Sequence, residues 1–514
     1  MAELLRWTGH PLVDVGVAAL CAMTDKGAPQ ALTLDDLDRA AAEMQEYYFS
    51  GFLTSYLTCV FMNAEYVQPG SGSAKEASRK KYAQRVLFAH RSEPDPGITG
   101  QTCVFSGRPA THLIHRGQMP LLTGEGVLNF YPAARGGLPV CGPYLTALQA
   151  LPIGGRRVEG KLLVAHADDS RLMIDLARLY VADNRRLFAL ATAGNLPAGD
   201  GPHLSLEREQ AAWDAKQKRP KYPDAKSAPS LITADLMDIW ETKSWMGQEG
   251  APTSVTVYWL SSSGQGPSLA IYHLPSNLIR FLILAARPST RMQWRRMVGR
   301  GWQDPIKSPE PSSPSDQPKK ARRTKPAAPA VTGGPGRSRN EVLSDLFSIY
   351  ESGYLNLTAA GAFLCRHLLS YFRGAIHHSA ECDWSLTELF LKEVFGMQPE
   401  RIEAIRSFAD RLAEHIRNRN DEGLFRSLVY ARWPGDFRNA LTKAQRNEAR
   451  SNHELLFGLE EYLSVFEADE SVGRVDWSLV RDLISIRLVE QLHKAGFLRD
   501  TLLAKPEEVP ANAN

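Results

Sequence analysis

Two cysteine-led turns stand close together in the sequence, and each has the layout of half a zinc site. Cys103 leads to Ser106, and Cys141 leads to Tyr144, with 37 residues between the two cysteines. A zinc ribbon places a second cysteine three residues after each first one, because four thiolates complete a tetrahedron around the ion. Ser106 and Tyr144 stand where those second cysteines belong. We therefore predict a degenerate ribbon that binds no metal.

Two histidines between the cysteines leave an alternative open. His112 and His115 could supply nitrogen ligands and complete a Cys-His-His-Cys set. Their spacing is unusual for such a site. The competing interpretation places both histidines on a strand or its edge, with both cysteines as small buried side chains. On that interpretation, purified protein contains almost no metal.

The elements around this region predict an α+β protein that opens with a mixed α/β body over residues 1–302. The first 70 residues are expected to be helical, with Asp14 capping a short apolar helix that runs to Met23, and Thr33 with Asp36 forming a capping box for a long helix over residues 34–62. Short strand-like runs and Gly- or Pro-rich turns follow, and the ribbon-like region occupies about 100–155. This body is predicted to hold the strands of the protein.

Residues 303–339 mark a boundary. They contain eight prolines and eight Lys or Arg against three acids, with almost no large apolar residue. Such a composition cannot form a core, so we predict a disordered tether. Residues 340–514 then show amphipathic helical periods almost throughout, among them 342–350, 357–372 and 438–457, which indicates an all-α helical bundle.

Four basic clusters are candidate contacts to nucleic acid. Guanidinium and ammonium groups neutralise backbone phosphates, amides read groove edges, and tryptophans such as Trp294 and Trp302 can stack on bases. The competing interpretation for each cluster is an exposed loop or a solvated helix face. In the bundle, the acids that would balance such a face are Glu403, Asp410, Glu414 and Glu422. The candidate residues are Asn63, Gln68, Lys75, Arg79, Lys80 and Lys81; Lys216, Lys218, Arg219 and Lys221; Arg291, Arg295 and Arg296; and Arg406, Arg417, Arg438, Lys443 and Arg446.

No set of residues has the spacing of an enzyme active site. Residues 155–161 match the start of a phosphate-binding loop, but Leu162 replaces the Ser or Thr that holds magnesium, and the strand-like run follows the motif instead of preceding it. The His377-His378 pair has only Glu381 and Asp383 near it, in a loop-like setting. We therefore predict no catalytic residues and no cofactor.

Composition gives little further direction. Sixty Lys and Arg against 57 Asp and Glu leave a net charge of +3, so any nucleic-acid surface must come from local segregation of charge. Six scattered cysteines and an N-terminus without a basic-then-apolar leader predict a cytoplasmic protein. The most apolar window, residues 278–286, is far shorter than the roughly 20 residues that span a bilayer.

The N-terminal part of the chain resembles a known family. The motifs are Trp7 to Gly16 (WTGHPLVDVG), the turns at Cys103 and Cys141, residues 129–132 (NFYP), and residues 148–154. In order and spacing they resemble the large subunit of type I-B CRISPR surveillance complexes (Cascade), in its Cst-type branch, over most of residues 1–300. Ser106 and Tyr144 depart from the cysteines typical of such relatives.

The resemblance implies a non-catalytic subunit of an RNA-guided complex. Its expected partners are guide RNA, target double-stranded DNA, the displaced single strand, and the backbone, guide-handle-binding and small subunits. Such a subunit recognises the target-flanking motif, helps to open the duplex, and recruits a helicase-nuclease or a transposition targeting protein. In this family the C-terminal helical part can also be made separately, by internal translation, as a small subunit that lines the displaced strand.

Two other functions remain open from the sequence. One is a stand-alone nucleic-acid-binding adaptor with a degenerate zinc ribbon. The other is a cryptic metal-dependent nuclease that uses His377, His378 and Asp383. Cleavage of DNA by the pure protein with divalent metals, abolished by His378→Ala, would identify the nuclease. Guide RNA that copurifies with the chain would exclude the adaptor.

Overall fold

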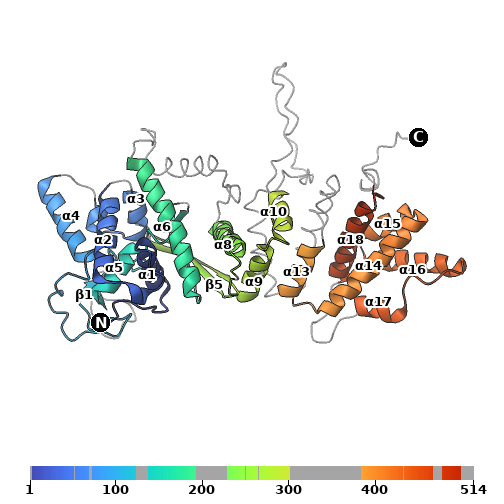
Figure 1. The fold of residues 1–514 in the computed structure, drawn as a ribbon, viewed down its shortest axis with the longest axis horizontal. Coiled ribbons are helices and arrows are strands. Elements are labelled where there is room, and N and C mark those ends of the chain that lie inside the picture. Colours follow the sequence, from blue (N-terminus) through green and yellow to red (C-terminus); the bar gives the residue numbers. More distant parts are fainter. Residues whose placement is uncertain are drawn as a thin grey trace, which may run out of the picture. The chain divides into compact units, whose positions relative to one another are not determined.

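The computed structural model describes residues 3–50, 53–68, 72–122, 137–158, 160–192, 228–248, 250–263, 266–300, 384–394, 396–431, 433–466 and 477–498. The chain divides into two compact units, residues 1–283 and 284–514. The first combines helices with a sheet, and the described elements of the second are all helices (Figure 1). The predicted combination of a mixed body and a C-terminal helical region is confirmed. The predicted tether at 303–339 lies outside the described residues.

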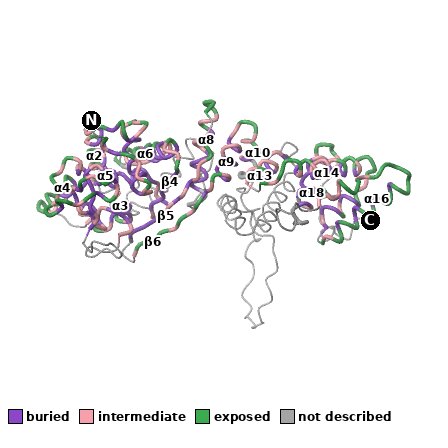
Figure 2. The backbone as a smooth tube through the Cα atoms, turned by 90° about the horizontal axis from the view of Figure 1, so that it is seen from below, coloured by how far each residue is buried: buried purple, intermediate pink, exposed green. Residues whose placement is uncertain are grey.

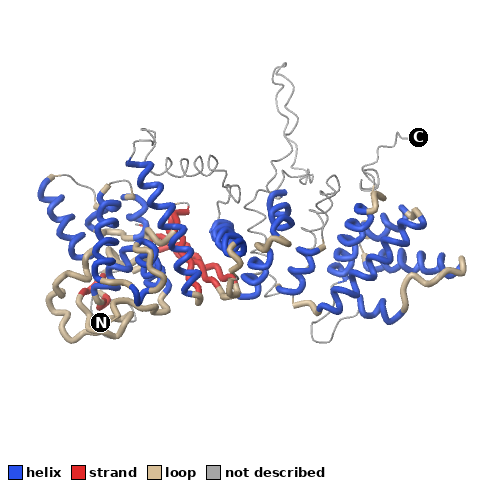
Figure 3. The backbone as a smooth tube through the Cα atoms, viewed as in Figure 1, coloured by secondary structure: helices blue, strands red, loops and turns tan. Residues whose placement is uncertain are grey.

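The sheet of the first unit has four antiparallel strands in the order β3-β4-β5-β6, drawn red in Figure 3. These strands are β3 (Arg156–Val158), β4 (Lys161–Ala167), β5 (Val255–Ser263) and β6 (Gly266–Leu274). Helices pack on it: α1 (Pro11–Met23), α3 (Thr54–Val60) and α6 (Ser170–Thr192) on β4, and α8 (Ala228–Trp245) on β5. A separate two-stranded hairpin pairs β1 (His112–Ile114) with β2 (Leu138–Val140).

Helix α1 is the centre of the first unit, since every residue from Leu12 to Met23 is buried. Asp14, in its first turn, accepts hydrogen bonds from the backbone nitrogens of Thr8 and Gly9 at 2.8 and 2.9 Å. Burial alone would raise the pKa of Asp14, but these bonds and one from His166 outweigh it and lower that pKa. The prediction that Asp14 caps this helix is wrong, because the helix begins at Pro11 with His10 as its N-cap and has no side-chain capping bond. Asp14 instead fixes the segment before the helix, which accounts physically for part of the WTGHPLVDVG motif.

The predicted capping box is also present. The Thr33 hydroxyl accepts from the Asp36 nitrogen at 3.2 Å, and the Asp36 carboxylate accepts from the Thr33 nitrogen at 2.9 Å. This box opens α2 (Leu34–Phe49), which ends well before the predicted residue 62. A separate helix, α3, follows it. The unit also contains α4 (Ser73–Val86), α5 (Gly142–Ala150), α9 (Ser276–Ala285, whose last two residues fall in the second unit), and the short 3-10 helices η1 (Pro29–Ala31) and η2 (Glu65–Val67).

Gly16 allows α1 to pack directly on α5. A Cβ atom built at Gly16 would lie 2.0 Å from the backbone oxygen of Ala147. Gly16→Ala is therefore expected to force the helices apart and lower the free energy of unfolding of the first unit by about 1–3 kcal/mol. Urea unfolding followed by circular dichroism measures this loss. Gly27→Ala is the matched control, because nothing lies within 4 Å of its Cβ position; an equal loss in both variants would contradict this account.

The described helices of the second unit form a bundle around α14 (Pro399–Arg419), which packs against α15 (Glu422–Val429), α17 (Leu459–Phe466) and α18 (Trp477–Lys494). Helix α16 (Pro434–Arg450) packs on α15 and α18. The helices α10 (Arg291–Arg300) and α13 (Ser385–Glu393) precede them in the chain. The helices predicted at 342–350 and 357–372 lie outside the described residues.

The helix predicted from Arg438 to Phe457 stops early, at Arg450. Asn452 adopts a positive φ of 52°, and the Gln445 side chain then holds the returning chain by bonds to Leu456 and Phe457, each 2.8 Å long. The return packs the Phe457 ring 5.2 Å from the ring of Phe408 in α14. A tertiary contact therefore overrides a helical period that continues in the sequence.

An ion-pair network lies inside the bundle. Arg487, whose side chain is 8% exposed, binds Asp410 through two nitrogens at 2.6 and 2.8 Å and Glu490 at 2.7 Å. These carboxylates compensate the buried guanidinium, and they raise its pKa although burial alone would lower it. Asp410 thus serves the core, and it does not balance a surface arginine as the sequence suggested.

Across the described residues, no helix combines the length and the apolar content that crossing a membrane requires.

Candidate nucleic-acid interface

The turn at Cys103 is closed by two backbone hydrogen bonds. The Cys103 nitrogen donates to the Arg108 oxygen at 2.7 Å, and the Gly107 nitrogen donates back to the Cys103 oxygen at 2.9 Å. Gly107 closes the turn with a φ of +70°, which glycine adopts without strain. The β1–β2 hairpin follows, and Cys141 then stands at the N-cap of α5. The second half of the predicted ribbon is therefore the start of a helix and not a second β-turn.

The predicted ligand positions converge. The Ser106 Oγ lies 3.6 Å from the Cys141 Sγ, and the thiols of Cys103 and Cys141 are hydrogen-bonded. The interaction lowers the pKa of Cys103 and raises the pKa of Cys141. All four cysteines in the described residues are free. The chain thus brings two thiols and a hydroxyl close together.

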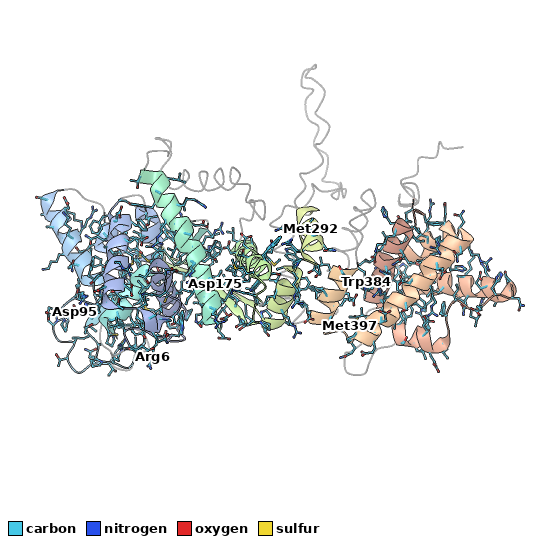
Figure 4. The ribbon with its side chains drawn as sticks, in the orientation of Figure 1. Arg6, Asp95, Asp175, Met292, Trp384 and Met397 are labelled. Carbon is cyan, nitrogen blue, oxygen red and sulfur yellow. The ribbon has the colours of Figure 1, made fainter. Side chains whose placement is uncertain are left out.

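Arg108 and Tyr144 fill the rest of this space. Arg108 Nη2 lies 3.8 Å from the Cys141 Sγ, and the guanidinium stands 5.6 Å from the centre of the Tyr144 ring. Arg108 also donates to the oxygens of Glu3 and Leu4 at 2.8 and 2.6 Å. Tyr144 accepts from the Arg6 nitrogen and donates to its oxygen, both at 3.1 Å; Arg6 is labelled in Figure 4. Hydrogen bonds from Arg108 and Tyr144 therefore tie this region to the N-terminal segment of the chain.

The two histidines of the alternative metal set do not join the cysteines. His112 is 1% exposed in β1, its Nδ1 lies 2.8 Å from the Thr111 hydroxyl, and burial lowers its pKa. His115 lines a groove next to α4. Within the described ranges, no three His, Cys, Asp or Glu side chains gather as metal ligands would. The Cys-His-His-Cys alternative is therefore not formed.

The residues predicted around α4 separate onto different sides of that helix. Lys81 faces a groove of about 700 Å³ with Gln84, Arg85, residues 91–96 and His115, whereas Arg79 and Lys80 border another hollow with Glu46 and Glu76. Lys80 pairs with Glu76 at 2.8 Å, and Arg79 donates to the Gln68 oxygen. Asn63 is exposed with a φ of +75°, and Lys75 is half-buried. The structure does not gather the six residues into one patch.

The groove beside Lys81 has mixed charge, because the exposed acid Glu93 lines it together with Lys81. Its two arginines are paired with acids: Arg85 binds Asp95, labelled in Figure 4, through two bonds of 2.7 and 3.1 Å, and Arg91 binds Asp38 at 2.9 Å. Lys81 is exposed and has no acidic partner among the residues that the structure describes. Of the α4 candidates, Lys81 is best placed to meet a phosphate.

Helix α10 does not offer the predicted stacking platform. Trp294 is 0% exposed, so our prediction that it stacks on a base is wrong; its apolar ring is core. Arg291 and Arg295 are half-buried on the same helix, and the side chain of Arg296 lies outside the described part of the chain. Trp302, the cluster Lys216, Lys218, Arg219 and Lys221, and the residues His377, His378, Glu381 and Asp383 also lie outside it.

The arginines of α14 are balanced by acids. Arg406 lies 3.6 Å from Glu403, and Arg417 lies 4.0 Å from Glu414, each pair within one helical turn. Arg411 pairs with Glu461 of α17, and Arg419 binds Glu448 at 2.9 Å. For this helix, the interpretation as a solvated face whose arginines are balanced by acids is confirmed.

Helix α16 is different, because its cations face solvent without acids. Phe437, Ala440, Leu441, Ala444 and Glu448 form its buried side. Its exposed cations fall within an arc of about 140° on the other side, at 100° per residue; they are Arg438, Lys443, Arg446 and Arg450, which we call the α16 face. No acidic partner of these four occurs among the described residues. Figure 2 shows the exposed, green part of this helix.

The acids of α16 do not cancel this charge. Glu448 points into the bundle, where it is 8% exposed and binds Arg419 and His453. Burial alone would raise the pKa of Glu448, but these cations outweigh it and lower that pKa, so Glu448 is ionised and neutralised internally. Asp436 is exposed in the first turn. The α16 face therefore carries four cations against one acid at its edge.

Sequence reasoning missed one exposed aromatic at this surface. Trp433, the N-cap residue of α16, is 71% exposed. The available signal was its position directly before Pro434, because proline favours the first helical position and so places Trp433 outside the helix.

The structure also shows one hydrogen-bonded triad of enzyme-like composition. His90 lies 2.8 Å from Asp38 through Nε2 and 3.1 Å from the Thr146 hydroxyl through Nδ1. Thr146 is 0% exposed, so its hydroxyl cannot reach a substrate. The phosphate-loop match at residues 155–161 belongs to the β3–β4 hairpin, whereas that motif needs a strand followed by a helix. Both features are structural.

No family model, curated protein or solved structure matches this chain.

Proposed function

We propose that this chain is the non-catalytic large subunit of a type I-B RNA-guided CRISPR surveillance complex. In this role it recognises the motif that flanks the target, binds the guide-containing complex and the target DNA, and stabilises the displaced strand. It also recruits an effector, either a helicase-nuclease or a transposition targeting protein. The motif resemblance of residues 1–300 supports the family, and the α16 face supports binding to nucleic acid.

The α16 face is the observation that carries this proposal. A helix face with four exposed cations and no acid between them attracts polyanions, because each bound phosphate releases counterions. The neighbouring α14 has a similar number of arginines but pairs them with acids, so charge is segregated onto one helix. Such segregation supplies the local positive surface that a net charge of +3 does not.

The region from Cys103 to the start of α5, which we call the knuckle region, supports the same family. We propose that the order of knuckle, β-hairpin and helix descends from a zinc site in which Ser106 and Tyr144 replaced two cysteines. The cross-links through Arg108 and Tyr144 then explain how this region remains ordered without a metal. Lys81, beside its open groove, is the candidate contact to the flanking duplex.

Coexpression of the full chain with its genomic neighbours tests the proposed function. We expect the purified assembly to contain a guide RNA, several partner subunits and a short C-terminal product of this chain. A C-terminal affinity tag should retrieve the full chain and the short product, whereas an N-terminal tag should retrieve the full chain with any product bound to it. Synonymous recoding upstream of the internal start distinguishes translation from proteolysis, because only translation is sensitive to it. A lone, RNA-free monomer that does not bind polyanions would contradict the proposal.

A further inference from the structure

Trp433 exposes its ring at the beginning of the α16 face. It is 71% exposed, whereas Trp294 and Trp384 of the same unit are 0% and 3% exposed. A tryptophan carries a large apolar surface that folding normally buries at least in part. Among the described residues, no ring contact, cation or hydrogen-bond partner involves its side chain. The fold therefore does not use this ring.

The backbone nevertheless holds Trp433 firmly. Its oxygen accepts from the nitrogens of Asp436 and Phe437 at 3.1 and 3.3 Å, as the first bonds of α16. Its φ of −121° and ψ of 150° are extended, as a residue before proline requires, and Pro434 restricts the next step of the chain. The ring therefore projects from a fixed base, which reduces the entropy lost when a ligand packs on it.

The surroundings of Trp433 are open and positively charged. Nothing lies within 4 Å of the Cβ position of Gly435, so a ligand can approach the first turn of α16 closely. Arg438 is one turn further on, and its Nε lies 3.4 Å from the Pro434 oxygen, which directs the side chain back toward the start of the helix. The other cations of the face continue for about 18 Å to Arg450, at 1.5 Å per residue. An exposed aromatic ring thus stands directly before a row of exposed cations along the chain.

We propose that Trp433 stacks on an unpaired base, so that the α16 face binds single-stranded nucleic acid in preference to duplex. This inference rests on the proposed function and specifies the class of ligand. Aromatic rings bind single strands of any sequence because every base has a π-face, whereas the bases of a duplex are already stacked and inaccessible. The cations supply the backbone contacts, and the ring supplies the preference for an unpaired strand.

The test compares full-length wild type with Trp433→Ala and Trp433→Phe. Dissociation constants are measured by fluorescence anisotropy for a labelled oligothymidylate and for a mixed-sequence duplex of equal length, across a series of salt concentrations. Trp433→Ala should weaken single-strand binding by about 5- to 150-fold, the range for one stacked base, and change duplex binding less than about twofold. Trp433→Phe should recover much of the loss. Leu459→Ala is the matched control, because Leu459 is 73% exposed in the same unit and cannot stack.

The salt dependence separates this inference from the proposed function. If Trp433 stacks, Trp433→Ala lowers single-strand affinity at every salt concentration without changing the slope of log affinity against log salt. An equal loss for single strand and duplex, or no loss for either, would overturn the stacking role. In that case the proposed function would still stand if alanine at the four cations of the α16 face lowered affinity and slope. Unchanged oligonucleotide binding with loss of another subunit from the assembly would instead identify Trp433 as a protein contact.

Discussion

Alanine at Arg438, Lys443, Arg446 and Arg450 is expected to weaken binding of the full chain to single-stranded DNA and to flatten its salt dependence. Each phosphate that a cation neutralises adds about 0.7 to the slope of log affinity against log salt for a single strand. Loss of four such contacts should therefore lower the slope by up to about 3. Because the slope counts released ions, it reports phosphate contacts separately from stacking. Anisotropy titrations across a salt series measure it.

A matched pair of double variants provides the control. Arg438→Ala with Arg446→Ala removes two unpaired cations and should lower the slope by about 1.4. Arg406→Ala with Arg417→Ala removes two cations that face Glu403 and Glu414, and it should change the slope much less. Both pairs remove the same formal charge from exposed helix positions. Equal effects of the two pairs would show that net charge, and not the α16 face, determines binding.

The α16 variants should fold normally. The four side chains are exposed, and alanine is the best helix former, so their removal costs neither core packing nor helical propensity. Circular dichroism and the midpoint of urea unfolding should match wild type. Unchanged affinity and slope in a folded quadruple variant would remove the α16 face from the nucleic-acid interface.

Restoring two cysteines is expected to restore a zinc site. Ser106→Cys with Tyr144→Cys should bind close to one zinc ion per chain, against almost none for wild type, as measured by elemental analysis of protein purified with zinc. The geometry favours this outcome, since Zn–S bonds of about 2.3 Å in a tetrahedron place sulfurs roughly 3.8 Å apart. Ser106 Oγ already lies 3.6 Å from Cys141 Sγ, and the Cys103 thiol bonds to the same sulfur.

Tyr144 is the substitution that matters most for this result. Its ring is 0% exposed and occupies the space beside Cys141. Tyr144→Cys therefore both frees the space that a zinc ion needs and supplies the fourth thiol. Arg108, with Nη2 3.8 Å from the Cys141 Sγ, would then compensate part of the negative charge of a four-thiolate zinc centre. Each single variant offers only three thiols and should bind zinc more weakly. A folded double variant with four titratable thiols and no zinc would show that these positions do not descend from a metal site.

Several expectations about local structure were confirmed because neighbouring residues decide them. The capping box of Thr33 and Asp36 involves positions three apart, and the turn after Cys103 is closed by Gly107, four positions on. Helix α16 instead begins at Pro434, four residues before the predicted Arg438, because proline favours the first turn, and its end at Arg450 was missed as well. That end depends on Phe457 packing against a different helix, which the sequence around it does not reveal.

The charged residues show the limit of sequence reasoning most clearly. Eleven basic residues from 401 to 450 look alike in the sequence, and four acids near them were candidate partners. In the structure Glu403 and Glu414 do face arginines of their own helix, whereas the half-buried Asp410 binds the buried Arg487 of α18. Glu448, which lies among the cations of α16, turns inward to Arg419 and leaves its own helix positive. The arginine that each acid pairs with depends on how the helices pack. The α16 face could therefore not be located from the sequence.

The sequence by itself determined the helical and strand-bearing halves, the capping box of α2, the turn after Cys103, and the two cysteine positions of the knuckle region, since these depend on periodicity and on residues a few positions apart. Only the tertiary structure decided that Trp294 is buried and Trp433 exposed, that Arg108 and Tyr144 fill the knuckle, and that the free cations gather on α16. The physical reason is that burial and charge compensation are properties of contacts between segments far apart in the chain.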